Sequence, residues 1–258
     1  MAIITLLSDF GLQDPSAAIA KGLLLQAVPS VNIVDITHEL QPFNKRQAAY
    51  FLDCAYEKFP NGTIHLCILD IYYDINAIVI LCEHNGHYFI APDNGVIPLA
   101  FHKADIAAWQ CFEMNNQNTF HDFIRSTGIF INQLQDKQPL LLNLPPHTLV
   151  YQNEFENSGL GVFRCEVIHI DSFGNVVLNF KKEHYEKFGK NKSITLTFIQ
   201  FEEIKEIHVH YNDVREGYKL CRFNSNGYLE ICINCGRAET LFGLKVGGKN
   251  NNVEIRFR

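Results

Sequence analysis

Two aspartates follow apolar segments in the first part of this chain. Asp9 comes after the apolar run Ile3–Leu7, and Asp70 stands near the end of a longer apolar run that begins at Thr63. In open α/β sheets, ligands bind at the edge where the parallel strands end, and a carboxylate there can accept hydrogen bonds from a vicinal diol such as a ribose. An Asp in a turn that contains Gly is equally common. The residue types alone therefore do not decide whether Asp9 binds a ligand or is a structural turn residue.

Asp70 and two more polar residues stand out against apolar surroundings. Asp70 is costly to bury without a partner, so it is either a hydrogen-bonded structural residue or a functional one. His121 has the chemistry of a general acid or base, although a lone His is more often structural. Asp93, in the segment Ala91–Gly95, is typical of a tight turn.

In the second half, the segment Ile170–Asn175 separates two apolar runs. Asp171, Phe173 and Asn175 surround a single Gly there, and together they offer a carboxylate, a stacking face and an amide to a base. The segment Asn224–Glu230 is by default a hairpin. The sequence contains no GxGxxG loop, P-loop, HExxH or GxSxG motif, so the common nucleotide-binding, metalloprotease and serine-hydrolase signatures are absent from it.

The elements that must position these residues change in character near residue 145. Before it, apolar strands alternate with helices, which predicts an α/β N-terminal domain with a mostly parallel, layered sheet. The expected strands are Ile3–Leu7, Val31–Ile36, Thr63–Ile71, Ala77–Glu83 and His87–Ala91, with helices near 14–27 and 43–59.

Beyond residue 145, short strands separated by turns predict a small all-β, barrel-like C-terminal domain. These strands are expected at 164–170, 193–198, 206–211, 229–234 and 253–257. The α/β domain is placed at 1–150, the β-barrel domain at 163–258, and a linker at 151–162.

The charge and composition exclude several classes of partner. The formal net charge is −6, and no basic run is longer than a pair such as Lys181-Lys182, so no surface for a nucleic-acid backbone is expected. No stretch approaches the roughly 18 apolar residues that a membrane helix needs. The N-terminus lacks the basic segment of a signal peptide, and we therefore expect a cytoplasmic protein with neither a membrane nor a nucleic acid as partner.

The eight cysteines are expected to be reduced, because the chain is long and shows no export signal. Cys232 and Cys235 form a lone CxxC with no second pair or His pair at ligand spacing, and two strand cysteines are a better interpretation than a zinc site. We expect no metal and no other cofactor.

Seven short motifs fall in the order and spacing of one family. They are Ser8–Gly11, Asp35–His38, Ala91–Gly95, Phe120-His121, Ile170–Asn175, Tyr211–Val214 and Asn224–Ile231. With them, nearly the whole chain resembles the S-adenosylmethionine (SAM) hydroxide adenosyltransferases and their relatives, the SAM-dependent fluorinase and chlorinase. The resemblance implies an α/β N-terminal domain, a β-barrel C-terminal domain and a homotrimer. It further implies that SAM binds between the N-domain of one subunit and the C-domain of its neighbour.

The reaction that the resemblance implies is the hydrolysis of SAM. Water or hydroxide attacks the ribose C5′, methionine leaves, and adenosine is formed. The sulfonium is already a good leaving group, so the protein must mainly hold a desolvated oxygen nucleophile in line with the C5′–S bond. A base or a polarising carboxylate raises the reactivity of that nucleophile.

The resemblance also implies a role for each matching residue. Asp70 and His121 match the Asp and the His of a catalytic Asp-Arg-His set. The implied substrate-binding residues are Asp9 at the ribose hydroxyls, Phe43 against the substrate, Phe173 and Tyr211 around the adenine, Asn175 and the Cys235 backbone at the adenine edge, Asp171 at the methionine ammonium, and Ser225 at the amino-acid end.

Two departures from the family's pattern bear on activity. The Arg has no counterpart, because the segment 71–76 is shorter than the family's loop and contains neither its two glycines nor an Arg. Asp122 stands where the halogenases carry a Ser, so it disfavours halide binding. A second carboxylate beside Asp70 is also expected to raise the pKa of one of the two.

Two functions are therefore retained, a divergent SAM hydrolase and a non-catalytic binder of adenosine or SAM that has lost the chemistry. A metal-dependent hydrolase that uses Asp9, Asp70, Asp93 and His121 has less support, since their spacing has no ligand signature.

Overall fold

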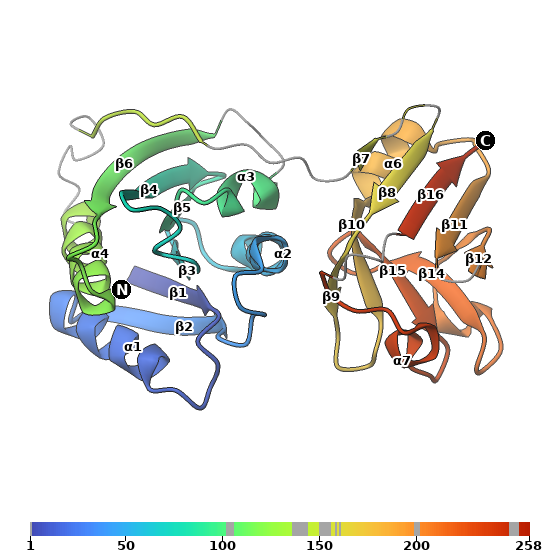
Figure 1. Cartoon of the computed structure of the whole chain (residues 1–258), viewed down its shortest axis with the longest axis horizontal. Coiled ribbons are helices and arrows are strands. Elements are labelled where there is room, and N and C mark those ends of the chain that lie inside the picture. The colour runs from blue at the N-terminus through green and yellow to red at the C-terminus, as the bar shows by residue number, and fades with distance from the viewer. Residues whose placement is uncertain are drawn as a thin grey trace. The chain divides into compact units, whose positions relative to one another are not determined.

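The computed structural model describes residues 2–101, 106–135, 144–149, 156–157, 159, 161–198, 202–247 and 253–258. The chain divides into two compact units, Met1–Gln152 and Asn153–Arg258 (Figure 1). The predicted linker at 151–162 falls mostly outside the described residues. Among the described helices, none combines the length and the hydropathy of a transmembrane segment.

In the described residues of the first unit, a six-stranded sheet has the order β2-β1-β3-β5-β4-β6. Its strands are β1 (Ala2–Ser8), β2 (Val31–Thr37), β3 (Ile64–Ile68), β4 (Ala77–His84), β5 (His87–Pro92) and β6 (Ala107–Met114). β1 pairs in parallel with β2 and β3, and β3 pairs in parallel with β5, whereas β4 is antiparallel to β5 and β6. The sheet is therefore mixed, and only its β2-β1-β3-β5 part is parallel as expected.

The antiparallel part begins at a two-residue turn. Asn85 and Gly86 connect β4 to β5 with φ values of 49° and 78°, which is the conformation that a tight hairpin requires at both positions. The Asn-Gly pair thus reverses the chain where a parallel connection would need a longer crossover.

Helices pack on both faces of this sheet (Figure 1). α1 (Ser16–Ala27) and α4 (Phe120–Gln135) share one hydrophobic core with Leu6 and Leu66. α2 (Lys45–Ala55) and α3 (Val96–Phe101) share the other core with Leu7 and Cys67. Successive strand residues point to opposite faces, so β1 and β3 contribute to both cores and are mostly apolar on both faces instead of alternating between apolar and polar residues.

The strand directions bring several loops to one edge of the sheet, which we call the carboxyl edge. β1 and β3 end there side by side, with Ser8 opposite Ile68, and β5 ends at the same edge. β6 is antiparallel to β4 and so runs in the direction of β1, which places the start of α4 at this edge too. The chain order reverses around β1, and such switch points are where α/β sheets bind ligands.

The second unit contains, in its described residues, two five-stranded sheets with the orders β13-β14-β15-β10-β9 and β12-β11-β16-β8-β7. The strands are β7 (Glu156–Asn157), β8 (Val162–Cys165), β9 (Val167–Ile170), β10 (Val176–Lys181), β11 (Ile194–Phe198), β12 (Glu202–Ile204), β13 (Ile207–His208), β14 (Lys219–Phe223), β15 (Tyr228–Ile233) and β16 (Val253–Phe257). Leu178 and Ile231 of one sheet share a core with Phe163 and Ile255 of the other.

Two strand predictions for this unit are wrong, and the barrel-like form is not confirmed. The pairings form two separate sheets, so a closed barrel is not confirmed, and the short helices α6 (Lys182–Phe188) and α7 (Ala238–Phe242) accompany the strands. The predicted strand 164–170 is interrupted at Glu166, whose N–H donates to Asn179 Oδ1 at 2.7 Å, and β8 and β9 on either side belong to different sheets. Tyr211 lies in the 3-10 turn η2 (Tyr211–Asp213) instead of a strand.

A buried row of polar side chains joins β1, β3 and β5. Thr5 Oγ1 lies 2.7 Å from His65 Nδ1, and His65 Nε2 lies 3.1 Å from His87 Nδ1. Burial lowers the pKa of His65 to about 3, and it also lowers the pKa of His87. His65 is therefore neutral in the folded protein at neutral pH, and its protonation favours the unfolded chain.

Substituting Gln for His65 should remove this proton-linked destabilisation. The wild-type free energy of unfolding should fall as the pH drops below about 6.5, and His65 should contribute up to about 1.4 kcal/mol per pH unit. His65→Gln should decline less steeply over the same range. Unfolding in urea is followed by the fluorescence of Trp109, the single tryptophan. Because Trp109 lies in β6, this signal reports on the first unit. His121→Gln changes an exposed histidine and is the control; equal slopes for wild type and His65→Gln would contradict the assignment.

Candidate functional site

The loops after β1 and β2 are fastened to each other at the carboxyl edge. Asp9 Oδ2 accepts a hydrogen bond from the Phe43 N–H at 3.0 Å. Beside it, the Gly11 N–H donates to the His38 carbonyl oxygen at 2.6 Å, and Ser8 Oγ lies 2.6 Å from His38 Nδ1. In the described residues Asp9 Oδ1 makes no hydrogen bond, so one oxygen of this carboxylate is available to a ligand.

Three predicted site residues adopt a backbone conformation that non-glycine residues rarely occupy. The φ value is 60° at Phe43, 51° at Asp70 and 56° at Cys235. Such conformations cost of order 1–3 kcal/mol each, and they persist where the surrounding structure fixes them, often at functional sites. The other positive-φ residues in the described chain that are not Gly are Asn85 and Asn191, and both lie in turns, where Asn tolerates this conformation.

Contacts from two other elements hold Asp70, which follows β3. The Leu69 carbonyl oxygen accepts a hydrogen bond from the buried Asn94 side chain at 2.8 Å. The same Asn94 side chain accepts the Val96 N–H at the start of α3, at 3.2 Å. The Asp70 carboxylate lies 3.5 Å from Lys45 Nζ at the start of α2. The loop after β5 thus fixes the backbone at Asp70, and α2 supplies a charge partner.

The first turn of α4, which carries His121, lies at the same edge. The rings of Phe10 and Phe120 meet edge-on at 5.2 Å, so the loop after β1 is in contact with the start of α4. Within the described residues, no hydrogen bond or ion pair joins Asp70 to His121. The predicted Asp and His therefore share an edge of the sheet without a direct link.

Asp122 caps α4. Its Oδ2 accepts the Thr119 N–H at 2.8 Å and the Thr119 hydroxyl at 2.7 Å, and Thr119 Oγ1 accepts the Asp122 N–H at 3.3 Å. This reciprocal pair is a capping box. The hydrogen bonds from the Thr119 backbone and hydroxyl lower the pKa of the Asp122 carboxyl. The expectation that a neighbouring carboxylate raises a carboxyl pKa is therefore wrong for Asp122.

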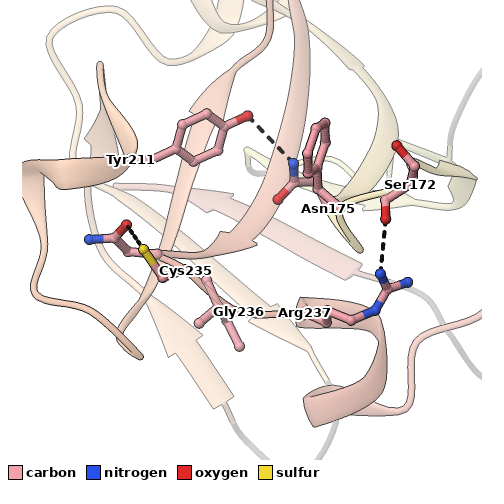
Figure 2. A pocket seen from close by; sticks show the side chains of 9 residues that line it. Ser172, Asn175, Tyr211, Cys235, Gly236 and Arg237 are labelled. Carbon is pink, nitrogen blue, oxygen red and sulfur yellow. Dashed lines mark hydrogen bonds between the residues drawn. The ribbon is translucent and has the colours of Figure 1, made fainter.

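The second unit holds a cavity of about 570 Å³ (Figure 2). It is lined by Ser172, Phe173, Asn175, Tyr211, Ile233, Asn234, Cys235, Gly236 and Arg237. Four predicted binding residues from three separate segments, Phe173, Asn175, Tyr211 and Cys235, therefore line one pocket.

Ser225 is a predicted binding residue that does not line this pocket. It lies in the turn before β15, whereas Cys235 follows the end of that strand. A six-residue strand spans roughly 17–20 Å, at about 3.3 Å per residue. Ser225 and the pocket are thus at opposite ends of β15.

Asp171 organises the loop that forms one wall of the pocket. Its Oδ1 accepts the N–H groups of Phe173 at 2.9 Å and of Asn175 at 2.8 Å, and its Oδ2 accepts Asn175 Nδ2 at 2.8 Å. Gly174 has a φ of 84°, and a Cβ there would lie 2.1 Å from Glu239 Oε2. A side chain here would force Glu239 and Arg237 to shift, and the pocket-facing residues on either side owe their placement to Asp171 and Gly174.

A buried ion pair holds Tyr211. Its hydroxyl donates to Glu230 Oε1 at 2.9 Å, and Arg222 Nη1 donates to the same oxygen at 3.0 Å. The Arg222 guanidinium lies 4.5 Å from the centre of the Tyr211 ring. Burial raises the pKa of Tyr211 to about 12, and the bond to Glu230 acts in the same direction, so the phenol stays protonated. Its hydroxyl also lies 3.5 Å from Asn175 Nδ2 (Figure 2).

In the described part of the chain, no three His, Cys, Asp or Glu side chains gather closely enough to hold a metal ion. Asp93 Oδ2, one member of the metal set considered from the sequence, lies 2.6 Å from His147 Nε2. Asp9 and Asp70 face the Phe43 N–H and Lys45 instead.

Comparison with known proteins assigns both parts of the chain to one family. The profile of the SAM hydroxide adenosyltransferase N-terminal domain matches residues 4–130, and the profile of the C-terminal domain matches residues 165–250. This chain belongs to the SAM hydroxide adenosyltransferase family. The resemblance found in the sequence motifs is thereby confirmed.

Several relatives of this adenosyltransferase-family chain match it over most of their length. A protein of Methanocaldococcus jannaschii named (R)-S-adenosyl-L-methionine hydrolase is 30% identical, over 89% of this chain and 87% of its own. A protein of the same name from Thermus thermophilus is 27% identical, over 96% and 98%. The crystal structure of an uncharacterized conserved protein from Thermotoga maritima covers 99% of this chain and 100% of its own, with a TM-score of 0.77 and 26% identity.

Sequence reasoning missed three residues at the sites of this family member. Lys45 reaches Asp70 from a helix that is distant in sequence, and although the predicted residue Phe43 lies two positions before it, no motif marks the lysine itself. Asn94 was interpreted only as part of a turn, although a buried amide beside a candidate carboxylate is a positioning signal. Arg237 lines the pocket, where its Nη1 donates to the Ser172 carbonyl oxygen at 2.9 Å (Figure 2).

Gly174→Ala should destabilise the second unit by about 1–3 kcal/mol, because the new methyl group meets the Glu239 carboxylate at a strained φ. Calorimetric unfolding of the full chain measures this loss. Gly227→Ala is the matched control, since Gly227 has a φ of 79° and no atom within 4 Å of an added Cβ. It reports the backbone strain alone. Equal destabilisation in the two variants would contradict the role given to the Glu239 contact.

Proposed function

We infer that this chain hydrolyses SAM to adenosine and L-methionine. The observation that carries this inference is its similarity, at 24–30% identity over 89–96% of the chain, to four proteins named (R)-S-adenosyl-L-methionine hydrolase. The similarity to fluorinases covers only 24% of the chain. The substrate is accordingly proposed to be SAM with the R configuration at sulfur, and water, not a halide ion, is the proposed nucleophile.

The reaction replaces a carbon–sulfur bond with a carbon–oxygen bond. A water oxygen bonds to the ribose C5′, the C5′–S bond breaks, and its electron pair stays on sulfur as the neutral thioether of methionine. The water loses one proton to a base. Because the sulfonium leaves readily, catalysis depends on orienting and activating the water.

We assign the activation of water to Asp70 and the binding of the ribose diol to Asp9. The two carboxylates follow neighbouring parallel strands, and the strained backbone at Asp70 supports a residue that is fixed for function. The available oxygen of Asp9 suits a ribose hydroxyl. Phe43, bonded to Asp9 through its N–H, is assigned a place against the substrate, and His121 completes the catalytic set.

The pocket of the second unit is assigned to the adenine. Its volume of about 570 Å³ lies within the roughly 300–1,000 Å³ of small-molecule sites. Phe173 and Tyr211 would stack on the base, Asn175 would bind its edge, and the Cys235 backbone would contribute one contact.

Asp171 and Ser225 are assigned to the amino-acid part of SAM. Asp171 would pair with the methionine ammonium in addition to ordering its loop, since each carboxylate oxygen can accept more than one hydrogen bond. Ser225 does not line the pocket, so its contact would need the substrate to extend beyond the adenine site.

We further propose a homotrimer in which the carboxyl edge of one subunit and the pocket of its neighbour enclose SAM, with a barrel-like C-terminal domain. The division of the assigned residues between the two units supports this arrangement. A sedimentation mass of a single subunit at the concentration of the activity assay would refute it.

One observation favours a second function, that of a non-catalytic binder of adenosine or SAM. The segment 71–76 after Asp70 contains no Gly and no Arg, so the family's way of handling the nucleophile is altered at this loop. The binding residues do not depend on that segment.

Incubation with SAM, followed by chromatography of the products, separates the two functions. We expect the wild type to release equal amounts of adenosine and methionine. Asp70→Asn should lower the single-turnover rate by roughly 10²–10³ because one preorganised polar group is lost, while adenosine affinity persists. Binding of SAM without any turnover by the wild type would favour the non-catalytic function, and equal rates for wild type and Asp70→Asn would refute the assigned role.

Asp9→Ala should weaken adenosine binding by roughly 1.5–3 kcal/mol, which is the loss of a charge-assisted hydrogen bond. Titration calorimetry measures the affinity. Asp14→Ala removes an exposed carboxylate five positions further along the same loop region and should leave the affinity unchanged. Unchanged affinity in Asp9→Ala, or a crystal structure with the ribose elsewhere, would refute the assignment.

A further inference from the structure

The charge partner of Asp70 comes from another element of the fold. Lys45 Nζ lies 3.5 Å from Asp70 Oδ2, and the two side chains are 28% and 21% exposed. Both groups are largely withdrawn from water, and partly buried charges are screened much less than charges at the surface. The segment 71–76, which follows Asp70, contains no Lys or Arg that could take this place.

The start of α2 directs Lys45 to this position. Lys45 is the first residue of the helix, and its N–H donates to the Phe43 carbonyl oxygen at 3.1 Å. Phe43 has left-handed backbone geometry, and its own N–H donates to Asp9 at 3.0 Å. A continuous path of hydrogen bonds and one ion pair thus connects Asp9, through Phe43 and Lys45, to Asp70.

Two other basic side chains in the described part of the first unit face different carboxylates. Arg125 Nη1 lies 3.9 Å from Asp122 within α4, and Lys21 Nζ lies 2.5 Å from Asp35. Each of these cations has an acidic partner of its own. Among the ion pairs of the described residues, the one made by Lys45 reaches the carboxylate assigned to water activation.

We propose that Lys45 is a positioning residue for the activation of water by Asp70, a role that rests on the proposed hydrolase function. The ammonium holds one carboxylate oxygen and so gives the other a fixed direction. The Nζ–Oδ2 distance of 3.5 Å is longer than the roughly 2.7–2.9 Å of a direct charge-assisted hydrogen bond. The two groups therefore attract each other electrostatically without forming a direct hydrogen bond, and both keep hydrogen-bonding capacity for a water molecule.

A fixed carboxylate matters for a sulfonium substrate in particular. SAM carries a positive charge on the sulfur next to the reacting carbon, and Coulomb attraction draws a free carboxylate toward that charge. Lys45 competes for the same carboxylate and opposes this movement. Asp70 then stays directed at the water instead of pairing with the leaving group.

The test measures single-turnover conversion of SAM to adenosine by the full-length wild type, Lys45→Met, Lys45→Arg, Asp70→Asn and the Lys45→Met/Asp70→Asn double variant. We expect Lys45→Met to lower the rate constant roughly 10²-fold, with adenosine affinity nearly unchanged, and Lys45→Arg to restore most of the rate. Lys58→Met is the matched control, because Lys58 is an exposed lysine at the far end of the same helical segment, and it should equal the wild type.

The double variant separates positioning from an independent role. If Lys45 acts through Asp70, adding Lys45→Met to Asp70→Asn has no further effect, since residues that act as a unit are not additive. Multiplied losses in the double variant, a wild-type rate in Lys45→Met, or no gain from Lys45→Arg would overturn the proposal. A wild type that binds adenosine and never converts SAM would overturn the hydrolase function and this role with it. An active wild type whose Lys45 variants convert SAM at the same rate would overturn this role alone.

Discussion

The parallel pairing of β1 with β2 and β3 is the constraint on which the fold of the first unit and its candidate chemistry both depend. Because the three strands run in one direction, the loops that follow them leave the same edge of the sheet. Asp9, Phe43, Lys45 and Asp70 become neighbours in this way. A one-residue slip of β3 would exchange the residues that face the two helical cores, so the burial of both faces also fixes the register. The same strand register therefore determines both the packing of the two cores and the positions of the carboxylates.

Both units hold their site residues with polar groups that bind backbone. In the first unit, the buried Asn94 amide binds the carbonyl oxygen before Asp70. In the second, Asp171 accepts two backbone N–H groups of its loop, and Gly174 lets that loop pass close to Glu239. Left-handed backbone at Phe43, Asp70 and Cys235 shows that the surrounding contacts override local preference at these places.

The sequence predicts five of the six described strands of the first unit, because long apolar runs and an Asn-Gly turn are local signals, whereas β6 and α3 were not predicted. Asp122 has a structural role that the sequence analysis did not assign, although Thr119 and Asp122 have the spacing of a capping box. The two-sheet arrangement of the second unit and the Lys45–Asp70 pair depend on contacts between distant segments, which no local pattern encodes. Among the predicted pocket residues, Phe173 and Asn175 were marked by their residue types around Gly174, whereas Tyr211 and Cys235 came from the resemblance to a family.

The most direct measurement of the central claim, that water displaces methionine at the ribose C5′, is the fate of the solvent oxygen. Wild-type protein is incubated with SAM in water enriched in oxygen-18, and both products are examined by mass spectrometry. Attack at C5′ places one heavy oxygen in the adenosine and none in the methionine. Adenosine that forms at the same rate without the heavy oxygen would contradict the mechanism.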